Sequence, residues 1–140
     1  NNFVWMRRSD EAPNRVTQEL RNLTPGTLYS MKLTTADHRH YLEGIVEKQT
    51  HAVRIEIDGV EMIPDIGWQQ VMESSRGQEV APFARDRQPW FNHYWRLFRA
   101  TQPTAKLTVS DWSTPNDPGG PVGQELLYNF VEVQPYFEAK

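Results

Sequence analysis

Apolar and polar residues alternate along much of this chain, which is the pattern of β-strands that bury one face. The clearest case is residues 28–36, where every second side chain shares a face: Tyr29, Met31, Leu33 and Thr35. The other segments with this pattern are residues 16–20, 53–58, 60–63, 68–71, 95–100, 107–110 and 124–133. About eight short strands, with no sustained helical period, predict an all-β fold built as a two-sheet antiparallel sandwich.

Turn residues between these segments predict how some strands connect. Pro25-Gly26 follows the first predicted strand and is typical of a tight turn, because proline fixes φ and glycine accepts positive φ. Asp58-Gly59 is a strong two-residue hairpin signal. We therefore expect residues 60–63 to return antiparallel to the strand that precedes this turn.

Two segments lack a strand pattern. Residues 113–121 are rich in Pro, Gly, Asn and Asp and are predicted to form a surface loop. Residues 73–93 combine prolines, arginines and aromatic side chains without a period, which predicts a long ordered loop. Loops of this length are uncommon in compact domains and are often functional. This one is interpreted either as a binding loop or as a flap that covers a sheet edge or face.

The composition fits one compact domain and argues against several classes of protein. A chain of 140 residues with 38% hydrophobic side chains can bury one core. A net charge of -3 without a long basic stretch argues against nucleic-acid binding, and no apolar run is long enough for membrane insertion. The first residue is Asn1 and no signal segment follows, so residues 1–140 are interpreted as a single β-sandwich domain from a larger multidomain protein.

Three stretches resemble, in order, motifs of galactose-binding-like β-sandwich modules. Residues 18–33 (QELRNLTPGTLYSMKL) resemble the stretch Q-x-L-x-x-L-x-P-G-x-x-Y-x-L-x-F of carbohydrate-binding modules of the families four and nine type. Residues 95–100 (WRLFRA) and 105–110 (AKLTVS) are similar to their W-x-x-F-x-A and A-x-L-x-I strands. Residues 123–133 (GQELLYNFVEV) resemble the closing G … D-x-V-x-V strand. The resemblance spans residues 16–133 and implies a jelly-roll fold.

The same resemblance implies a function and a setting. It implies a non-catalytic carbohydrate-binding module, appended to a secreted bacterial polysaccharide-active enzyme or to a cell-surface protein, with a polysaccharide or glycan and the neighbouring domains as partners. Two features depart from the family pattern: the closing Asp is Asn129, and the opening strand that often helps to bind a structural calcium ion is not evident in residues 1–10. The resemblance therefore gives little support to calcium, and no other cofactor is indicated.

A sugar site needs an aromatic platform for the C–H faces of the ring and planar polar groups for its hydroxyls. Aromatic and polar side chains concentrate at the end of the predicted 73–93 loop. The residues predicted to bind carbohydrate there are Trp90, Phe91, Arg85, Arg87 and Asn92, and the two further aromatic candidates are Trp112 and Trp5. Phe91 is also compatible with packing beneath the loop.

Two pairs of basic residues, one of arginines and one of histidines, each have two interpretations. Arg7 and Arg8 beside Trp5 could hold an acidic sugar, but adjacent arginines on a strand point in opposite directions and are usually solvated.

His38 and His40 share a face if residues 37–40 continue a strand, which can suit a divalent metal ion. No third ligand stands at a recognisable spacing, and a polar loop is the other interpretation.

The sequence carries no signature of catalysis. It has no cysteine nucleophile, no Gly-x-Ser-x-Gly elbow, no phosphate-binding glycine loop and no dinucleotide fingerprint. The chain is therefore predicted not to be an enzyme by itself. The alternative to carbohydrate binding is a structural or protein-interaction sandwich domain of an extracellular multidomain protein, which would expose a contiguous apolar patch instead of a polar cleft.

Overall fold

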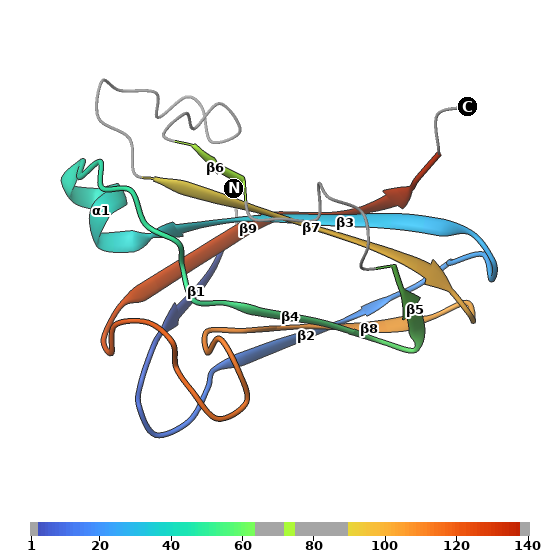
Figure 1. The fold of residues 1–140 in the computed structure, drawn as a ribbon, viewed down its shortest axis with the longest axis horizontal. Helices are drawn as coiled ribbons and strands as arrows, with labels where there is room; N and C mark the ends of the chain where they lie inside the picture. The colour runs from blue at the N-terminus through green and yellow to red at the C-terminus, as the bar shows by residue number, and fades with distance from the viewer. Residues whose placement is uncertain (1–2, 64–71, 75–89, 138–140) are drawn as a thin grey trace.

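The computed structural model describes residues 3–63, 72–74 and 90–137, and these residues form two antiparallel sheets that face each other (Figure 1). The larger sheet has the strand order β1 (Val4–Arg7), β9 (Glu125–Pro135), β3 (Leu28–Asp37), β7 (Phe91–Ala100) and β5 (Val60–Met62), and β6 (Met72–Ser74) also pairs with β7. The smaller sheet has the order β2 (Arg15–Leu20), β8 (Ala105–Ser110) and β4 (Arg54–Asp58). The prediction of an all-β, two-sheet antiparallel fold is confirmed for the described residues.

The hydrophobic core lies between the two sheets. Met31 and Leu33 of β3 and Phe98 of β7 come from the larger sheet and are fully buried. Leu107 and Val109 of β8 meet them from the smaller sheet. This burial explains the alternation in the sequence, because each strand presents every second side chain to the opposing sheet.

The predicted hairpin at Asp58-Gly59 is wrong, although the turn itself is present. Gly59 has φ 84°, as a glycine turn requires. However, β4 pairs with β8 in the smaller sheet, whereas β5 pairs with β7 in the larger sheet. The chain therefore crosses from one sheet to the other at Gly59. Local alternation could not reveal this, because it is satisfied equally well by a partner in either sheet.

A short helix and an additional strand complete the described fold. Residues 38–40 do not continue the strand: β3 ends at Asp37, which is the N-cap of α1 (His38–Glu43), and the helix ends at Gly44, whose φ is 66°. Six residues are too few to show a helical period in the sequence. The strand β1, which the sequence did not make evident, pairs with β9 at the edge of the larger sheet. The loop expected at 113–121 is largely exposed, and the strand expected at 68–71 lies outside the described residues.

The two ends of the sandwich differ in how the chain turns (Figure 1). At one end, three connections cross between the sheets within a few residues: β2 to β3, β4 to β5 and β7 to β8. Hydrogen bonds join these turns: Leu23 N to Pro103 O (2.9 Å), Gly26 N to Ala100 O (2.7 Å) and Thr101 Oγ1 to Gly59 O (2.8 Å). We call this the turn end. The opposite end carries α1 and the connections from β1 to β2 and from β8 to β9, and we call it the polar end.

Candidate functional site

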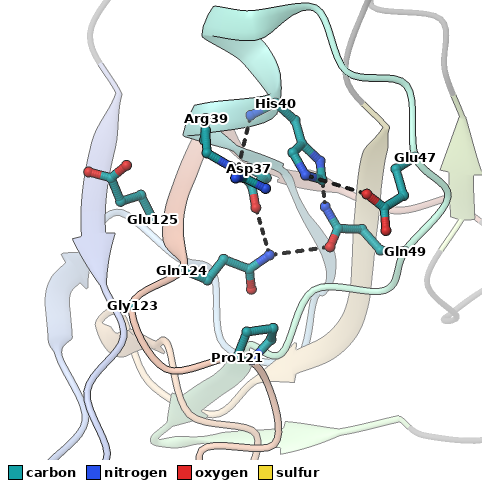
Figure 2. A pocket seen from close by; sticks show the side chains of 9 residues that line it. All are labelled: Asp37, Arg39, His40, Glu47, Gln49, Pro121, Gly123, Gln124 and Glu125. Carbon is teal, nitrogen blue, oxygen red and sulfur yellow. Dashed lines mark hydrogen bonds and ion pairs between the residues drawn. The ribbon is translucent and has the colours of Figure 1, made fainter.

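A cleft of about 380 Å³ opens at the polar end of the sandwich. It lies between the C-terminal end of β3, the helix α1, the segment after α1 and the connection that leads into β9 (Figure 2). Its lining residues are Asp37, Arg39, His40, Glu47, Gln49, Pro121, Gly123, Gln124 and Glu125. Most of these side chains are charged or carry an amide or imidazole group, so the cleft is a hydrogen-bonding site.

Asp37 stands at the centre of the cleft as an ionised carboxylate. Its Oδ1 accepts a hydrogen bond from the backbone N–H of His40 (3.1 Å), which caps α1, and its Oδ2 accepts one from Gln124 Nε2 (2.8 Å). Burial by itself raises the pKa of Asp37, but the hydrogen bonds from Gln124, His40 and Arg39 and the attraction to His40 outweigh it and hold the pKa below its ordinary value. The carboxylate is therefore negatively charged at neutral pH.

A chain of hydrogen bonds with one direction runs from Asp37 across the cleft through two glutamine amides to one imidazole (Figure 2). Arg8 can only donate, so the Gln124 Oε1 it contacts is the acceptor. Gln124 Nε2 then donates to Asp37 and to Gln49 Oε1 (3.3 Å). Gln49 Nε2 in turn donates to His40 Nδ1 (3.0 Å). The neutral His40 ring consequently carries its proton on Nε2, because Nδ1 is the acceptor.

Arg8 supports this chain of hydrogen bonds from behind the cleft. Its side chain is 1% exposed, and its guanidinium donates to the carbonyl oxygens of Asp111 (2.7 Å), Ala52 (2.7 Å) and Pro121 (3.3 Å), as well as to Gln124. Burial lowers the pKa of Arg8, and nearby negative groups, Asp111 first, oppose that change. Arg8 therefore ties three separate connections together at the polar end. It is not solvated, and its donors are occupied by protein groups instead of an acidic sugar.

Asn92 fixes the wall of the cleft that carries Gln49. Its side chain is 0% exposed; Oδ1 accepts from His51 N (2.6 Å) and Nδ2 donates to Gln49 O (2.9 Å). Tyr94 adds a third contact, because its hydroxyl donates to His51 O (2.7 Å). These bonds replace the sheet pairing that residues 49–51 lack, and they hold the Gln49 side chain at the cleft.

The carboxylates that flank the cleft have histidines as their partners. Glu47 Oε2 lies 3.7 Å from His40 Nε2, and Glu125 Oε2 lies 3.7 Å from His38 Nδ1. Glu125 points away from the other lining side chains, toward the β1 side of the cleft (Figure 2). An imidazole is a cation only when protonated, so neither contact is an ion pair while the histidine is neutral.

Trp5 is an exposed aromatic residue of β1 that contacts His38, the histidine partner of Glu125. Its side chain is 51% exposed, and its ring meets the His38 ring edge-on, with centroids 6.4 Å apart. The register of β1 against β9 pairs Trp5 with Leu127 and Arg7 with Glu125, so Trp5 and Glu125 share the outer face of the larger sheet. Trp5 is therefore connected to the Glu125 side of the cleft through the His38 ring.

The structure does not gather the predicted carbohydrate-binding residues into one exposed cluster. Phe91 and Asn92 belong to β7 instead of a loop and are buried, Phe91 being 3% exposed. Trp112 is also buried, and its indole N–H donates to Ser9 O (2.9 Å). Trp90 is half-buried immediately before β7. Arg85 and Arg87 lie outside the described residues, so Trp5 is the predicted candidate that stands exposed beside the cleft.

The possible metal site at His38 and His40 is not formed. In a helix, residues two positions apart point to different sides. His38 accordingly faces Glu125, whereas His40 faces Gln49 and Glu47. Among the residues that the structure describes, no three His, Cys, Asp or Glu side chains form a group that could hold a metal ion.

Sequence reasoning missed the residues that make the cleft. His40 stood out, but as a possible metal ligand together with His38, and Asp37, Gln49 and Gln124 were not predicted as site residues. Asp37 followed by Gly44 was an available signal, because an N-cap residue and a C-terminal glycine bracket a short helix. No local signal could bring together the two glutamines, which are 75 positions apart.

The described residues form an antiparallel β-sandwich with a polar cleft at one end. No protein-family model, curated protein or solved structure matches the chain, so its resemblance to galactose-binding-like modules rests on the sequence motifs. Across residues 3–63, 72–74 and 90–137, no helix has the length and apolar character to span a membrane.

Proposed function

We propose that this chain is a non-catalytic carbohydrate-binding module of the galactose-binding-like jelly-roll type, and that it holds a sugar in the polar cleft. The observation that carries the proposal is the convergence of Asp37, Gln49 and Gln124 in one cleft beside the exposed Trp5. The family resemblance of residues 16–133 supports the same function.

The chemistry of the cleft matches a polyhydroxylated ligand. A sugar hydroxyl both donates and accepts, and the cleft offers a carboxylate acceptor at Asp37, amides at Gln49 and Gln124, and the Nε2–H of His40. Trp5 would stack on the C–H face of a neighbouring sugar unit. The volume lies within the range of small-molecule sites, near its lower end, and suits one or two sugar units.

The proposal includes the setting that the motifs imply. The module would be secreted or displayed at a cell surface, joined to neighbouring domains such as a polysaccharide-active enzyme, and would bring them to a polysaccharide or glycan. The proposal assigns no role to a calcium ion. It also needs no catalytic residue, because binding alone concentrates an attached enzyme on its substrate.

A binding screen followed by matched variants tests the proposal. The purified chain is screened against plant, algal and bacterial glycans, and any glycan that binds is then titrated calorimetrically. We expect Trp5→Ala and Gln124→Ala each to weaken binding at least tenfold, whereas Phe137→Ala, which removes another exposed aromatic ring, leaves it unchanged. Saturable binding that survives both Trp5→Ala and Gln124→Ala would contradict this site, and no binding to any glycan would contradict the function.

A second candidate function is a structural or protein-interaction domain, and exposed apolar side chains on β1 and α1 and just before β1 favour it. Phe3, Trp5 and Leu42 are each at least half exposed. Leu42 stands one helical turn after His38, which contacts Trp5. Under this function, Leu42→Ala would weaken association with a neighbouring domain as strongly as Trp5→Ala does. Under carbohydrate binding, only Trp5→Ala would have an effect on ligand affinity.

A further inference from the structure

We infer that the cleft discriminates between sugars by charge: it favours amino sugars with a protonated amine and disfavours uronic acids and sulfated sugars. This inference rests on the proposed function and names the ligand class of the same site. It follows from the charges that line the cleft, from where their partners lie, and from the position of the arginines.

The groups that line the cleft carry more negative than positive charge. Three carboxylates line it, those of Asp37, Glu47 and Glu125, against one guanidinium, that of Arg39. Arg39 is largely exposed and lies 3.9 Å from Glu43, one helical turn away, so part of its charge is compensated outside the cleft. His40 also lines the cleft, and it is neutral when its Nδ1 accepts from Gln49. The side chains that line the cleft therefore carry a net negative charge, and Arg7, which lies opposite Glu125 across β1 and β9, is not among them.

The charged groups that are buried behind the cleft do not reverse the net negative charge of its lining. Arg8 is buried at the back of the cleft, but its donors are occupied by three carbonyl oxygens and by Gln124. The carboxylate of Asp111 is buried close to it and accepts two hydrogen bonds from Asn14 (both 2.8 Å). The positive charge of Arg8 is thus opposed by the nearby charge of Asp111, and the side chain is too deeply buried, with four of its five N–H groups already donating, to bind a sugar carboxylate or sulfate.

Glu47 is the flanking carboxylate best placed to recognise an amine, and Glu125 lies on the opposite side of the cleft. Each contacts an imidazole at 3.7 Å. Glu125 points toward β1, where Arg7 lies opposite it across the sheet. Neither carboxylate is held by a lysine or arginine in a short ion pair within the described residues. A sugar ammonium group would gain a charge-assisted hydrogen bond there, whereas a sugar carboxylate would meet like charge.

Three tetrasaccharides that share a β-1,4-linked backbone provide the test: oligomers of glucosamine, glucose and glucuronic acid. Their affinities are measured by calorimetry at pH 7 and low salt. We expect glucosamine to bind most tightly and glucuronic acid most weakly, with steps of roughly fourfold, which corresponds to one unit charge at about 5 Å in a water-like dielectric. Glu47→Gln and Glu125→Gln should each reduce the preference for glucosamine over glucose, and Glu19→Gln on the distant strand β2 should leave it unchanged.

The outcomes separate this inference from the proposed function. Binding of glucose and glucosamine oligomers with equal affinity, unaffected by either Gln variant, would overturn the charge discrimination and leave carbohydrate binding standing. Tightest binding of the glucuronic acid oligomer would overturn it as well. Failure of the chain to bind these oligomers and every glycan of the broader screen would overturn both.

Discussion

The two ends of this sandwich are built on different physical principles. At the turn end, three short connections cross between the sheets and are joined by two backbone hydrogen bonds and one from the Thr101 hydroxyl, above a core in which Tyr29 and Phe98 stack with ring centroids 5.7 Å apart. At the polar end, longer connections are held by buried side chains, among them Arg8, Asn92 and Asp111. The turn end is organised by backbone geometry, and the polar end by polar side chains.

The difference indicates where binding can evolve on this fold. Backbone-bonded turns leave few unsatisfied groups and little space between them. Connections that are held by side chains can instead enclose a cleft, because each polar group that fixes a loop also presents its remaining donors and acceptors. This is why Gln124 can contact Arg8, Asp37 and Gln49 and still line the cleft.

Removal of the Arg8 guanidinium should have the largest effect, because it breaks the organisation of the polar end. Arg8→Met keeps the length of the side chain but leaves three carbonyl oxygens without their donor and removes the positive charge near the buried carboxylate of Asp111. We expect the free energy of unfolding to fall by about 3–5 kcal/mol. Arg7→Met, at the exposed neighbour, should change it by less than about 0.5 kcal/mol. Equal losses in urea titrations of the two variants would show that Arg8 does not organise this end.

Asn92→Ala should weaken the polar end while leaving the turn end of the same molecule intact. It removes the hydrogen bonds that Asn92 makes to residues 49–51, so we expect a loss of about 2 kcal/mol. In hydrogen exchange, the His51 amide should lose protection, whereas the Gly26 amide at the turn end should keep its protection relative to global unfolding. Asn116→Ala on the exposed loop provides the control. Uniform loss of protection at both ends would show that they are one cooperative unit.

Two glycines provide a matched comparison between the ends. Gly59 at the turn end has φ 84° and Gly123 at the cleft has φ 89°. An alanine at either position is strained in this conformation, so Gly59→Ala and Gly123→Ala should each destabilise the protein by about 1 kcal/mol. Only Gly123→Ala should also weaken glycan binding, because Gly123 lines the cleft and its N–H donates to Arg8 O (2.7 Å). Equal effects of both variants on glycan affinity would contradict the location of the site.

The smallest expected effect is a pH dependence of stability that comes from Asp37. Because the pKa of Asp37 is lower in the folded protein than its ordinary value of 3.8, its stabilising contribution is fully present above that value. It is lost as the pH falls through the folded pKa. Asp37→Asn should therefore flatten the decline of the urea midpoint below about pH 4. An unchanged slope in Asp37→Asn, compared with the exposed control Asp10→Asn, would contradict the role of this carboxylate.

The sequence was sufficient to predict most of the described strands, but not β1, the start of β7, the strand partners or the site. Alternation located β3 and β8 because each buries one face of a regular strand. The same alternation could not distinguish a hairpin from a crossing between sheets at Gly59. Phe91 and Asn92 were expected in a loop, since the Pro- and Arg-rich segment before them obscured the start of β7.

The cleft itself was beyond local reasoning. The hydrogen bond between Gln49 and Gln124 depends on the complete packing of the sandwich, and glutamines carry no positional signal of their own. Arg8 shows the same limit of sequence-based reasoning. Adjacent arginines correctly indicated opposite orientations, but only the tertiary structure shows that one of them is buried among carbonyl oxygens.

The most direct test of this account is an NMR titration of the ¹⁵N-labelled chain with the tightest-binding glycan from the screen. Side-chain signals report on both parts of the site, because Trp5 has an indole N–H and Gln49 and Gln124 have amide groups. The account predicts saturable shifts of these three signals, with the backbone amides of Gly26 and Gly59 at the turn end unmoved. Saturable shifts at the turn end, with the Trp5, Gln49 and Gln124 signals unchanged, would contradict the claim that the polar end is the binding site.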